Sequence, residues 1–463
     1  MLIHEHRMFP AEAGARKVAA ALYAQVRNLP IVSPHGHTQA GWFASNGPFP
    51  DPATLFVQPD HYVFRMLYSQ GVSMDDLEIG RPVVKEPRKV WHIFASHYYL
   101  FRGTPTRMWL DYAFQELFGL QERLSENNAD LYYDTISEKL NTPQFLPRAL
   151  YERFNIEVLA TTDSPLDPLA NHQAIRDSGW KARIIPAFRP DSVVDPDFPG
   201  FAELIAKLGE QSGEDASSWN GYLHALAQAR ARFRSLGCVS TDHGHPTALT
   251  ADLPAGEAAA LFGKVLAGKA DAAGKELFRA QMLTEMARMS VEDGLVMQIH
   301  PGAVRNHNRL VAGRYGRDMG CDIPQATDFV HALRPLLDRF GNEKNLTIIL
   351  FMLDESAISR ELAPLAGHYP CLRLGPPWWF HDSPEGMMRF REQATETAGF
   401  YNTVGFNDDT RAFLSIPARH DMARRIDCAF LGRLVAEHRL DEDEACEVAR
   451  ELTYGLVKKA YKL

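Results

Sequence analysis

The chain has 463 residues, of which 45% are hydrophobic and 23% charged, and its formal net charge is −9. These values are typical of a globular protein with a large core. A negative net charge argues against non-specific nucleic-acid binding, which relies on a surplus of Lys and Arg. The longest apolar run, 346–353, is far too short to span a membrane. We therefore expect neither a nucleic-acid nor a membrane partner.

The N-terminal region and the cysteines indicate the compartment. Residues 1–30 lack the apolar core of a secretory signal peptide, and residues 11–26 have the pattern of an amphipathic helix. The five cysteines are widely spaced, and none belongs to a Cys-x-x-Cys motif. An odd number of scattered cysteines is typical of free thiols in a reducing compartment. We expect a cytoplasmic protein.

Eight short apolar runs, each bounded by turn or polar residues, have the pattern of buried strands. Segments with helical periodicity separate them, for example 221–234, 257–266 and 328–340. Alternating strands and helices predict a parallel sheet, and eight such units predict a closed (β/α)8 barrel of the TIM type, an α/β fold. The eight runs are Ile31–His37, Ile156–Asp163, Ala182–Asp191, Gly237–Gly244, Leu295–Gly302, Leu346–Asp354, Cys371–Trp378 and Tyr401–Asp409.

The interval between the first two runs is much longer than one crossover requires. Residues 38–155 contain helical segments such as 89–99 and 109–117. We interpret this interval as a mainly α-helical insertion on the catalytic side of the barrel. Residues 1–37 and 156–463 then form the barrel with its terminal helices, and 419–437 and 442–459 are predicted to be the closing helices.

Two histidines follow the first run, His35 and His37. Side chains two apart on a strand point the same way, so both imidazoles would leave one face at the strand's C-terminal end. Imidazole suits zinc, iron, nickel and similar metals, and active sites of β/α barrels lie at this end of the strands. Taken alone, the motif is equally compatible with two solvated loop histidines.

Polar and ionisable residues also follow most of the other runs. A barrel that serves only as a scaffold has no reason to collect such groups on one rim, so we expect a catalytic site there. The residues are Thr162 and Asp163, Arg189 and Asp191, Asp242 and His243, His300, Trp378 and Trp379, and Asp408, Asp409 and Arg411.

A His-x-His motif after the first strand with an Asp after the eighth resembles the metal-dependent amidohydrolase superfamily. Within it, a series of segments resembles the uronate (glucuronate) isomerase family. Each segment is modest evidence, but their joint occurrence in this order over nearly the whole chain is specific. The segments are Pro34–His37, Pro59–Tyr62, Thr161–Pro165, Phe188–Asp191, Thr241–Gly244, Gln298–Gly302, Arg305–Asn308, Gly375–Phe380 and Asp409–Arg411.

The resemblance implies a reaction and a cofactor. The reaction converts D-glucuronate to D-fructuronate and D-galacturonate to D-tagaturonate, by proton transfer between C2 and C1 through an enediol. The implied cofactor is one divalent metal ion, with zinc as the first expectation, held by His35, His37 and Asp409. Asp409 could instead cap a following helix, and the family's Asp-x-Arg spacing selects it over Asp408.

The resemblance also implies roles for the other rim residues. His61 and Tyr62 would act as acid or base, unless they merely pack at the start of a helix capped by Asp60. Arg189 and Arg411 would bind the substrate carboxylate and developing oxyanions, unless they form salt bridges with Asp191 or Asp408.

Three further residues complete the expected site. His300 would be a catalytic or substrate contact, although a histidine ending an apolar strand is usually a core residue. His243 would contact the substrate, or orient groups that do. Trp379 would form a wall against the sugar, a place that Trp378 could equally take.

Other functions use the same residues differently. The main alternative is a mononuclear metal-dependent hydrolase or lactonase, in which metal-bound hydroxide attacks the substrate. A non-catalytic sugar-acid-binding protein would not need the full ionisable rim. Within the isomerase, the base at C2 stays open among Tyr62, Asp409 and a metal-bound hydroxide. Assembly as a homo-oligomer is compatible with a chain of this size.

Overall fold

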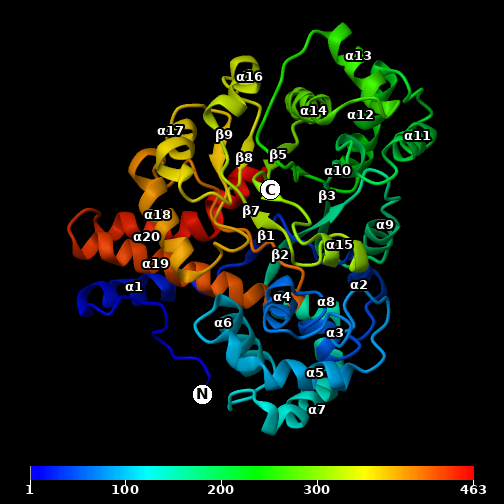
Figure 1. Ribbon diagram of the computed structural model, residues 1–463. Coiled ribbons are helices and arrows are strands. Elements are labelled where there is room, and N and C mark those ends of the chain that lie inside the picture. The colour runs from blue at the N-terminus through cyan, green and yellow to red at the C-terminus, as the bar shows by residue number, and fades with distance from the viewer. Residues whose placement is uncertain (1) are drawn as a thin grey trace.

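Seven parallel strands form the centre of the computed structural model, which describes residues 2–463 (Figure 1). Every pair of neighbouring strands in this curled sheet is parallel. Each strand lies within a range that the sequence predicted, so a TIM-like α/β fold is confirmed. In sheet order they are β1 (Ile31–Ser33), β2 (Ile156–Asp163), β3 (Arg183–Phe188), β4 (Ser240–His243), β5 (Val296–Ile299), β8 (Ile348–Leu350) and β9 (Leu372–Leu374).

The eighth predicted strand, 401–409, does not form a regular strand in the described part of the chain. One bridge joins Thr403 to Leu374 of β9, where the Leu374 N–H donates to Asn402 O and the Val404 N–H donates to Leu374 O. Beyond that point the backbone leaves the extended conformation, with φ of 75° at Gly405. Positive φ is incompatible with a strand, so the ladder ends there.

Helices cover the sheet (Figure 1). Short 3-10 and π segments join some of these helices. Predicted helices at 11–26, 221–234, 257–266 and 328–340 are confirmed as α1, α12, α13 and α16. Those outside the first crossover are α1 (Ala13–Val26), α9 (Ala170–Asp177), α10 (Asp191–Val194), α11 (Phe201–Ser212), α12 (Trp219–Ser235), α13 (Ala255–Leu266), α14 (Ala272–Asp293), α15 (Arg309–Tyr315), α16 (Val330–Phe340), α17 (Ala363–Ala366), α18 (Pro384–Ala398), α19 (Ile416–Ala436), α20 (Glu442–Arg450) and α21 (Leu456–Tyr461).

The chain between β1 and β2 is helical. In Figure 1, α3 to α8 gather in the lower part of the view, beneath the sheet. Their aromatic residues form a core that includes Trp91, Phe94 and Phe114 and extends to Ile31 and Ile156 of the neighbouring strands. The helices are α2 (Ala40–Ser45), α3 (Pro52–Phe56), α4 (His61–Ser69), α5 (Pro87–Ser96), α6 (Pro105–Tyr112), α7 (Ala129–Leu140) and α8 (Pro147–Arg153).

The first and last helices pack against the covering helices and the sheet, respectively. The N-terminal α1 lies so close to α19 that a Cβ at Gly432 would come 2.7 Å from Ala15 O. A π segment, Glu451–Gly455, joins α20 to α21, so the predicted closing helix 442–459 is interrupted. Figure 1 places the C-terminal end beside β5 and β8, consistent with Lys462 donating to Gly294 O and Asn345 O just before these strands. No helix in residues 2–463 has the length and apolar character needed to cross a bilayer.

A small antiparallel hairpin, β6 (Ala303–Val304) with β7 (Ile323–Pro324), was not predicted. It follows β5, and the chain between its strands carries α15. Gly320 of this segment lies against Phe64 and Arg65 of α4, where a Cβ would come 2.9 Å from the Phe64 ring. The hairpin therefore brings the chain after β5 into contact with the helix that begins at His61.

Candidate active site

A cavity of about 770 Å³ opens where the parallel strands end. The seven strands point their C-terminal ends toward one edge, so the residues that follow them meet there. Nine of the ten predicted site residues line this cavity, and His243 is the exception. The nine are His35, His37, His61, Tyr62, Arg189, His300, Trp379, Asp409 and Arg411.

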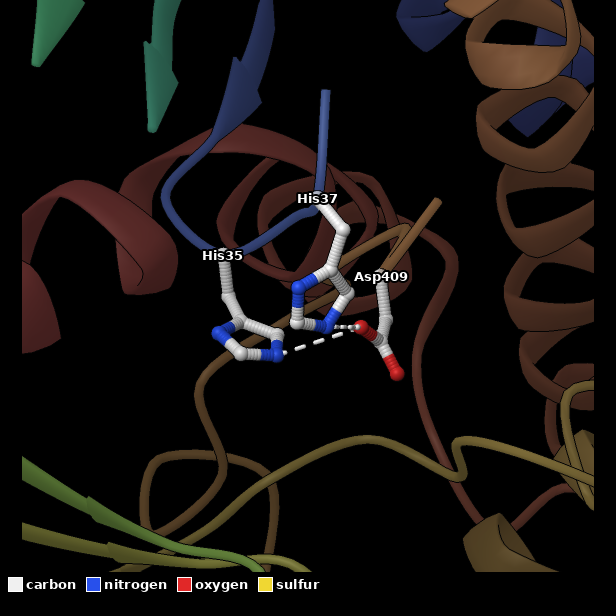
Figure 2. A group of neighbouring side chains, drawn as sticks. All are labelled: His35, His37 and Asp409. Atoms are coloured by element: carbon white, nitrogen blue, oxygen red, sulfur yellow. Dashed lines mark ion pairs between the residues drawn. The ribbon is translucent and has the colours of Figure 1, made fainter. Parts of the chain in front are cut away.

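Two histidines and one aspartate converge on a single oxygen atom (Figure 2). Nε2 of His35 lies 3.2 Å and Nε2 of His37 lies 3.0 Å from Oδ1 of Asp409. That oxygen accepts no hydrogen bond from the described residues. The three side chains form a group that could hold a metal ion. Two imidazole nitrogens and a carboxylate suit a divalent borderline metal and leave positions open for substrate, so the residues fit such an ion.

Asp409 rather than Asp408 faces the histidines. Asp408 is fully buried and its Oδ2 lies 3.0 Å from Nε2 of His420. Asp409 does not cap a helix either, because the next helical turn begins at Phe413 with Ala412 at the cap position. Its φ of 44° is in the left-handed region, which is rare for a residue other than glycine.

The charges in this group shift its pKa values. Burial alone would raise the pKa of the Asp409 carboxyl, but the His35 and His37 imidazoles hold it well below its usual range. Burial lowers the pKa of His37. At His35 burial acts in the same direction, but the carboxylates of Asp242 and Asp409 outweigh it and raise the pKa. Asp409 is therefore ionised at neutral pH.

His300 lies directly behind this group. Its ring stacks on His35 with centroids 4.6 Å apart, and its Nδ1 lies 2.8 Å from Oδ1 of Asp242. Burial lowers the pKa of His300 to about 4, so the imidazole is neutral at pH 7. His35, Asp242 and His300 form a second group that could hold a metal ion, which shares His35 with the first.

The two predicted arginines differ in how they are paired. Arg189 donates from Nη1 to Asp242 and from Nε to Asp191, each at 2.9 Å. A Cβ at Gly244 would come 2.2 Å from Nη2 of Arg189, so only glycine leaves room for this guanidinium. Arg411 also lines the cavity, but its guanidinium makes no ion pair or hydrogen bond with the described residues. The salt-bridge alternative thus holds for Arg189, through Asp191, and not for Arg411.

His61 and Tyr62 begin α4, and Asp60 caps the helix by accepting a hydrogen bond from the Tyr62 N–H. The Tyr62 hydroxyl donates to Oδ1 of Asp382 at 2.6 Å and accepts from the Phe380 N–H at 2.8 Å. Burial raises the pKa of Tyr62 well above its usual value. Both hydrogen-bonding positions of this phenol are therefore engaged. Burial and the nearby Arg411 lower the pKa of His61 to about 3.

Asp382 and Arg419 were not predicted. Both are buried, and Nη1 of Arg419 donates to Oδ2 of Asp382 at 2.8 Å. Arg419 lies within α19 and its guanidinium stacks over the Trp109 ring at 3.6 Å. Neither residue follows a strand, so the pattern of polar strand ends carried no signal for them.

The two tryptophans occupy different environments. Trp378 is buried, and its ring meets His300 edge-on with centroids 4.6 Å apart. Trp379 is half-buried and stacks on Phe380 at 4.7 Å. It also faces the His61 ring at 6.3 Å. Trp379 thus presents more of its surface to the cavity.

His243 lies behind the cavity wall. It is fully buried, its Nε2 is 2.9 Å from Thr241 Oγ1, and its ring is 5.9 Å from that of His245. The described residues that line the cavity do not include it. The expectation that His243 contacts the substrate directly is therefore not supported, because its position near the end of β4 directs the ring into the surrounding protein.

Residues 303–324 add four charged side chains to the cavity, Arg305, Arg317, Asp318 and Asp322. Arg305 donates to Asp322 at 2.8 Å. Burial would raise the pKa of Asp318, but Arg411 and Arg305 lower it. Asp318 has a φ of 61° and lies in an irregular segment, where periodicity gives no prediction.

Comparisons with known proteins agree with this geometry. The family model of glucuronate isomerase matches residues 11–461. A uronate isomerase from Rhizorhabdus wittichii is 64% identical over 461 residues, covering 100% of this chain and 98% of the relative. The crystal structure of a glucuronate isomerase from Caulobacter crescentus is 58% identical, with a TM-score of 0.98 over 99% of this chain and 97% of that chain. A uronate isomerase structure from Thermotoga maritima is 28% identical, with a TM-score of 0.93 over 100% of both chains.

Proposed function

This chain belongs to the glucuronate isomerase family, and from that premise we propose that its cavity interconverts D-glucuronate with D-fructuronate and D-galacturonate with D-tagaturonate. The observation that carries this proposal is the convergence of His35, His37 and Asp409 in a cavity that is also lined by Arg411, whose guanidinium makes no ion pair or hydrogen bond with residues 2–463. The reaction moves a proton between C2 and C1 of an anionic sugar. It therefore needs an anchor for the carboxylate, an acid–base group and stabilisation of the enediol oxygens.

The first need is met by Arg411. A guanidinium offers a planar fork that matches a carboxylate with two parallel hydrogen bonds. Arg189 is less available, because two of its nitrogens already donate to Asp242 and Asp191. We assign the substrate carboxylate to Arg411, and to Arg189 the task of holding Asp242 in place against His300.

The enediol oxygens would be stabilised by one divalent ion, which the cluster of His35, His37 and Asp409 would hold. When bound, the ion supplies Lewis acidity for the oxygens on C1 and C2. We propose zinc, because two imidazoles and one carboxylate with open positions match its catalytic sites. His300 supports this cluster by stacking on His35 with its imidazole neutral.

Acid–base work is assigned to His61 and Asp409 rather than to Tyr62. The His61 imidazole is uncharged at neutral pH, and its ring nitrogens make no hydrogen bond with the described residues. Tyr62 already donates to Asp382 and accepts from Phe380. We propose that Tyr62 fixes the backbone beside Trp379, which forms the wall against the sugar.

Three broader proposals complete this interpretation. Residues 38–155 are a helical insertion that supplies His61 and Tyr62 to the rim, and residues 1–37 and 156–463 form the barrel. Residues 401–409 are the irregular eighth strand that closes it, supported by the bridge to Leu374. The enzyme works in the cytoplasm, in keeping with five free cysteines.

Proton NMR in deuterated water tests the activity directly. D-Glucuronate and D-galacturonate are incubated separately with the zinc-loaded enzyme, with Asp409→Asn as the matched control. Ketouronate signals, together with deuterium at C2 of recovered aldose, are the expected result for an enediol route open to solvent. If neither sugar changes while lactones or esters are hydrolysed, the hydrolase alternative replaces this proposal.

A further inference from the structure

We infer that Tyr461, the last residue of α21, is a positioning residue for the reaction. Its hydroxyl holds Asn407 and Gln298, which stand two residues before Asp409 and His300. None of these three polar residues was predicted to serve the site. The inference rests on the proposed roles of Asp409 and His300.

The Tyr461 hydroxyl joins β5 to the irregular segment 401–409, which is far from it in the sequence. It donates to Oε1 of Gln298 at 2.7 Å and accepts from Nδ2 of Asn407 at 2.5 Å. Gln298 in turn donates from Nε2 to Ser240 Oγ at 3.2 Å and to Thr241 O at 3.3 Å. A single chain of hydrogen bonds therefore runs from the irregular eighth segment through α21 to β5 and β4.

This chain of bonds lies one layer beneath the site. Ser240 precedes Asp242 by two residues, as Gln298 precedes His300, and side chains two apart on a strand share a face. The interior layers of such barrels are usually filled by bulky branched apolar residues. Here Ser240, Gln298 and Asn407 are all at most 2% exposed, yet they are polar. Buried polar groups at these positions need partners, and Tyr461 provides one for two of them.

Asn407 depends on this partner more than the others do. Its Oδ1 makes no hydrogen bond with the described residues, so the bond from Nδ2 to Tyr461 is the anchor of its side chain. The backbone around it lacks a regular strand ladder, since in the described part of the chain this segment reaches β9 through the bridge of Thr403 to Leu374 alone. Gly405 instead lies against α20–α21, where a Cβ would come 2.6 Å from Leu452 O. The C-terminal helices thus replace neighbouring strands in holding the segment that presents Asp409.

A purely structural role is the alternative. Tyr461 is fully buried and packs with Val32, Val158 and Val457. Removing the hydroxyl alone separates the two roles, because Phe keeps the ring in this cluster while Asn407 and Gln298 lose their shared partner. A structural role predicts lower stability with unchanged chemistry. A positioning role predicts changes at Asp409 and His300 as well.

Tyr461→Phe is compared with Tyr454→Phe in the full-length, zinc-loaded enzyme. Tyr454 is a matched control, because its hydroxyl donates to Glu157 at 2.5 Å in the same C-terminal region but outside the cavity. The measurements are kcat, KM, the zinc Kd by chelator competition, and hydrogen exchange of residues 401–410 by mass spectrometry. For Tyr461→Phe we expect kcat to fall about tenfold, zinc to bind about tenfold more weakly, and exchange of 401–410 to become faster. KM should change less than kcat, because Arg411 is outside this hydrogen-bonded chain.

Wild-type kcat, zinc Kd and exchange in Tyr461→Phe would overturn the inference, even if the melting temperature fell. If Tyr461→Phe is insoluble, Gln298→Met is measured instead, because it removes the hydrogen-bond acceptor of Tyr461 at similar side-chain volume. It should reproduce the fall in kcat. An unchanged kcat in Gln298→Met would also overturn the inference. Failure of the proposed metal site is a separate outcome. In that case the wild-type enzyme would bind no zinc. The kcat and the hydrogen exchange of residues 401–410 in Tyr461→Phe would still test the role of Tyr461.

Discussion

Nε2 of His37 lies 3.0 Å from Oδ1 of Asp409, although the two residues are near opposite ends of the chain. Asp409 reaches this position with a φ of 44°, a left-handed conformation that costs a non-glycine residue about 1–2 kcal/mol. The fold maintains this conformation through contacts on both sides, including the His37 N–H donating to Thr410 O at 2.9 Å. Strain of this kind is often retained where function requires it.

Replacing Asp409 with Asn should remove most of the bound metal. The neutral amide loses the negative charge that faces two imidazoles, so we expect zinc affinity to fall at least about tenfold and kcat about a hundredfold or more. Metal analysis of the purified protein and steady-state kinetics measure the two effects. Asp408→Asn is the control, because Asp408 contacts His420 and should retain its zinc. Equal metal loss in both variants would contradict the assignment.

Arg411→Met should weaken substrate binding without loss of stability, whereas Arg189→Met should mainly lower the stability of the fold. Loss of a charge-assisted pair with the substrate carboxylate, about 1.5–3 kcal/mol, predicts a KM raised roughly 10- to 100-fold with stability nearly unchanged. Arg189→Met leaves Asp242 and Asp191 without their cation, so we expect it to destabilise the fold by about 3 kcal/mol. Kinetics and urea unfolding of both variants check this. A wild-type KM in Arg411→Met would move the substrate carboxylate elsewhere.

Tyr62→Phe distinguishes positioning from acid–base catalysis. If Tyr62 only fixes the backbone at Phe380, kcat should fall about tenfold and the shape of the pH profile should persist. If the phenol is instead the catalytic acid or base, kcat should fall about 10²- to 10⁴-fold and one limb of the pH–rate profile should disappear. Tyr98→Phe is the matched control, because Tyr98 forms the same kind of group with Asp111 and Arg107 outside the cavity.

Because of Asp163, the free energy of unfolding should decrease as the pH rises from about 4 to above 6, the opposite of the usual effect of a carboxylate. Burial raises its pKa to about 6, from an ordinary value of 3.8. The stabilising contribution is therefore fully present below about pH 4 and is lost as the pH rises through 6, a change of about 2–3 kcal/mol. Asp163→Asn should raise the free energy of unfolding at pH 7.5 and leave it nearly unchanged at pH 4. Urea unfolding at both pH values tests this, with the exposed Asp177→Asn as a control that should show no such difference.

Much of the fold follows from local patterns in the sequence. Buried strands appear as short apolar runs, and seven of the eight predicted runs contain strands because burial on both faces requires continuous apolar residues. The run at 401–409 has fewer apolar residues, Tyr401, Val404 and Phe406, and it lacks the ladder, since Gly405 turns the backbone away from β9. Composition alone does not report such a turn.

Motifs, places after apolar runs and the resemblance to the isomerase family were enough to predict the candidate site residues His35, His37, Asp409 and Arg411 from the sequence. Their ion-pair and hydrogen-bond partners are visible only in the tertiary structure. It pairs Arg189 with two carboxylates, gives Arg411 no ion pair or hydrogen bond within residues 2–463, engages both positions of the Tyr62 hydroxyl and places His243 behind the cavity wall. Local patterns reflect the direction and burial of side chains along one segment. The partner of a charged or polar group is set by packing between distant segments, as it is for Asp382 with Arg419 and for Tyr461 with Asn407.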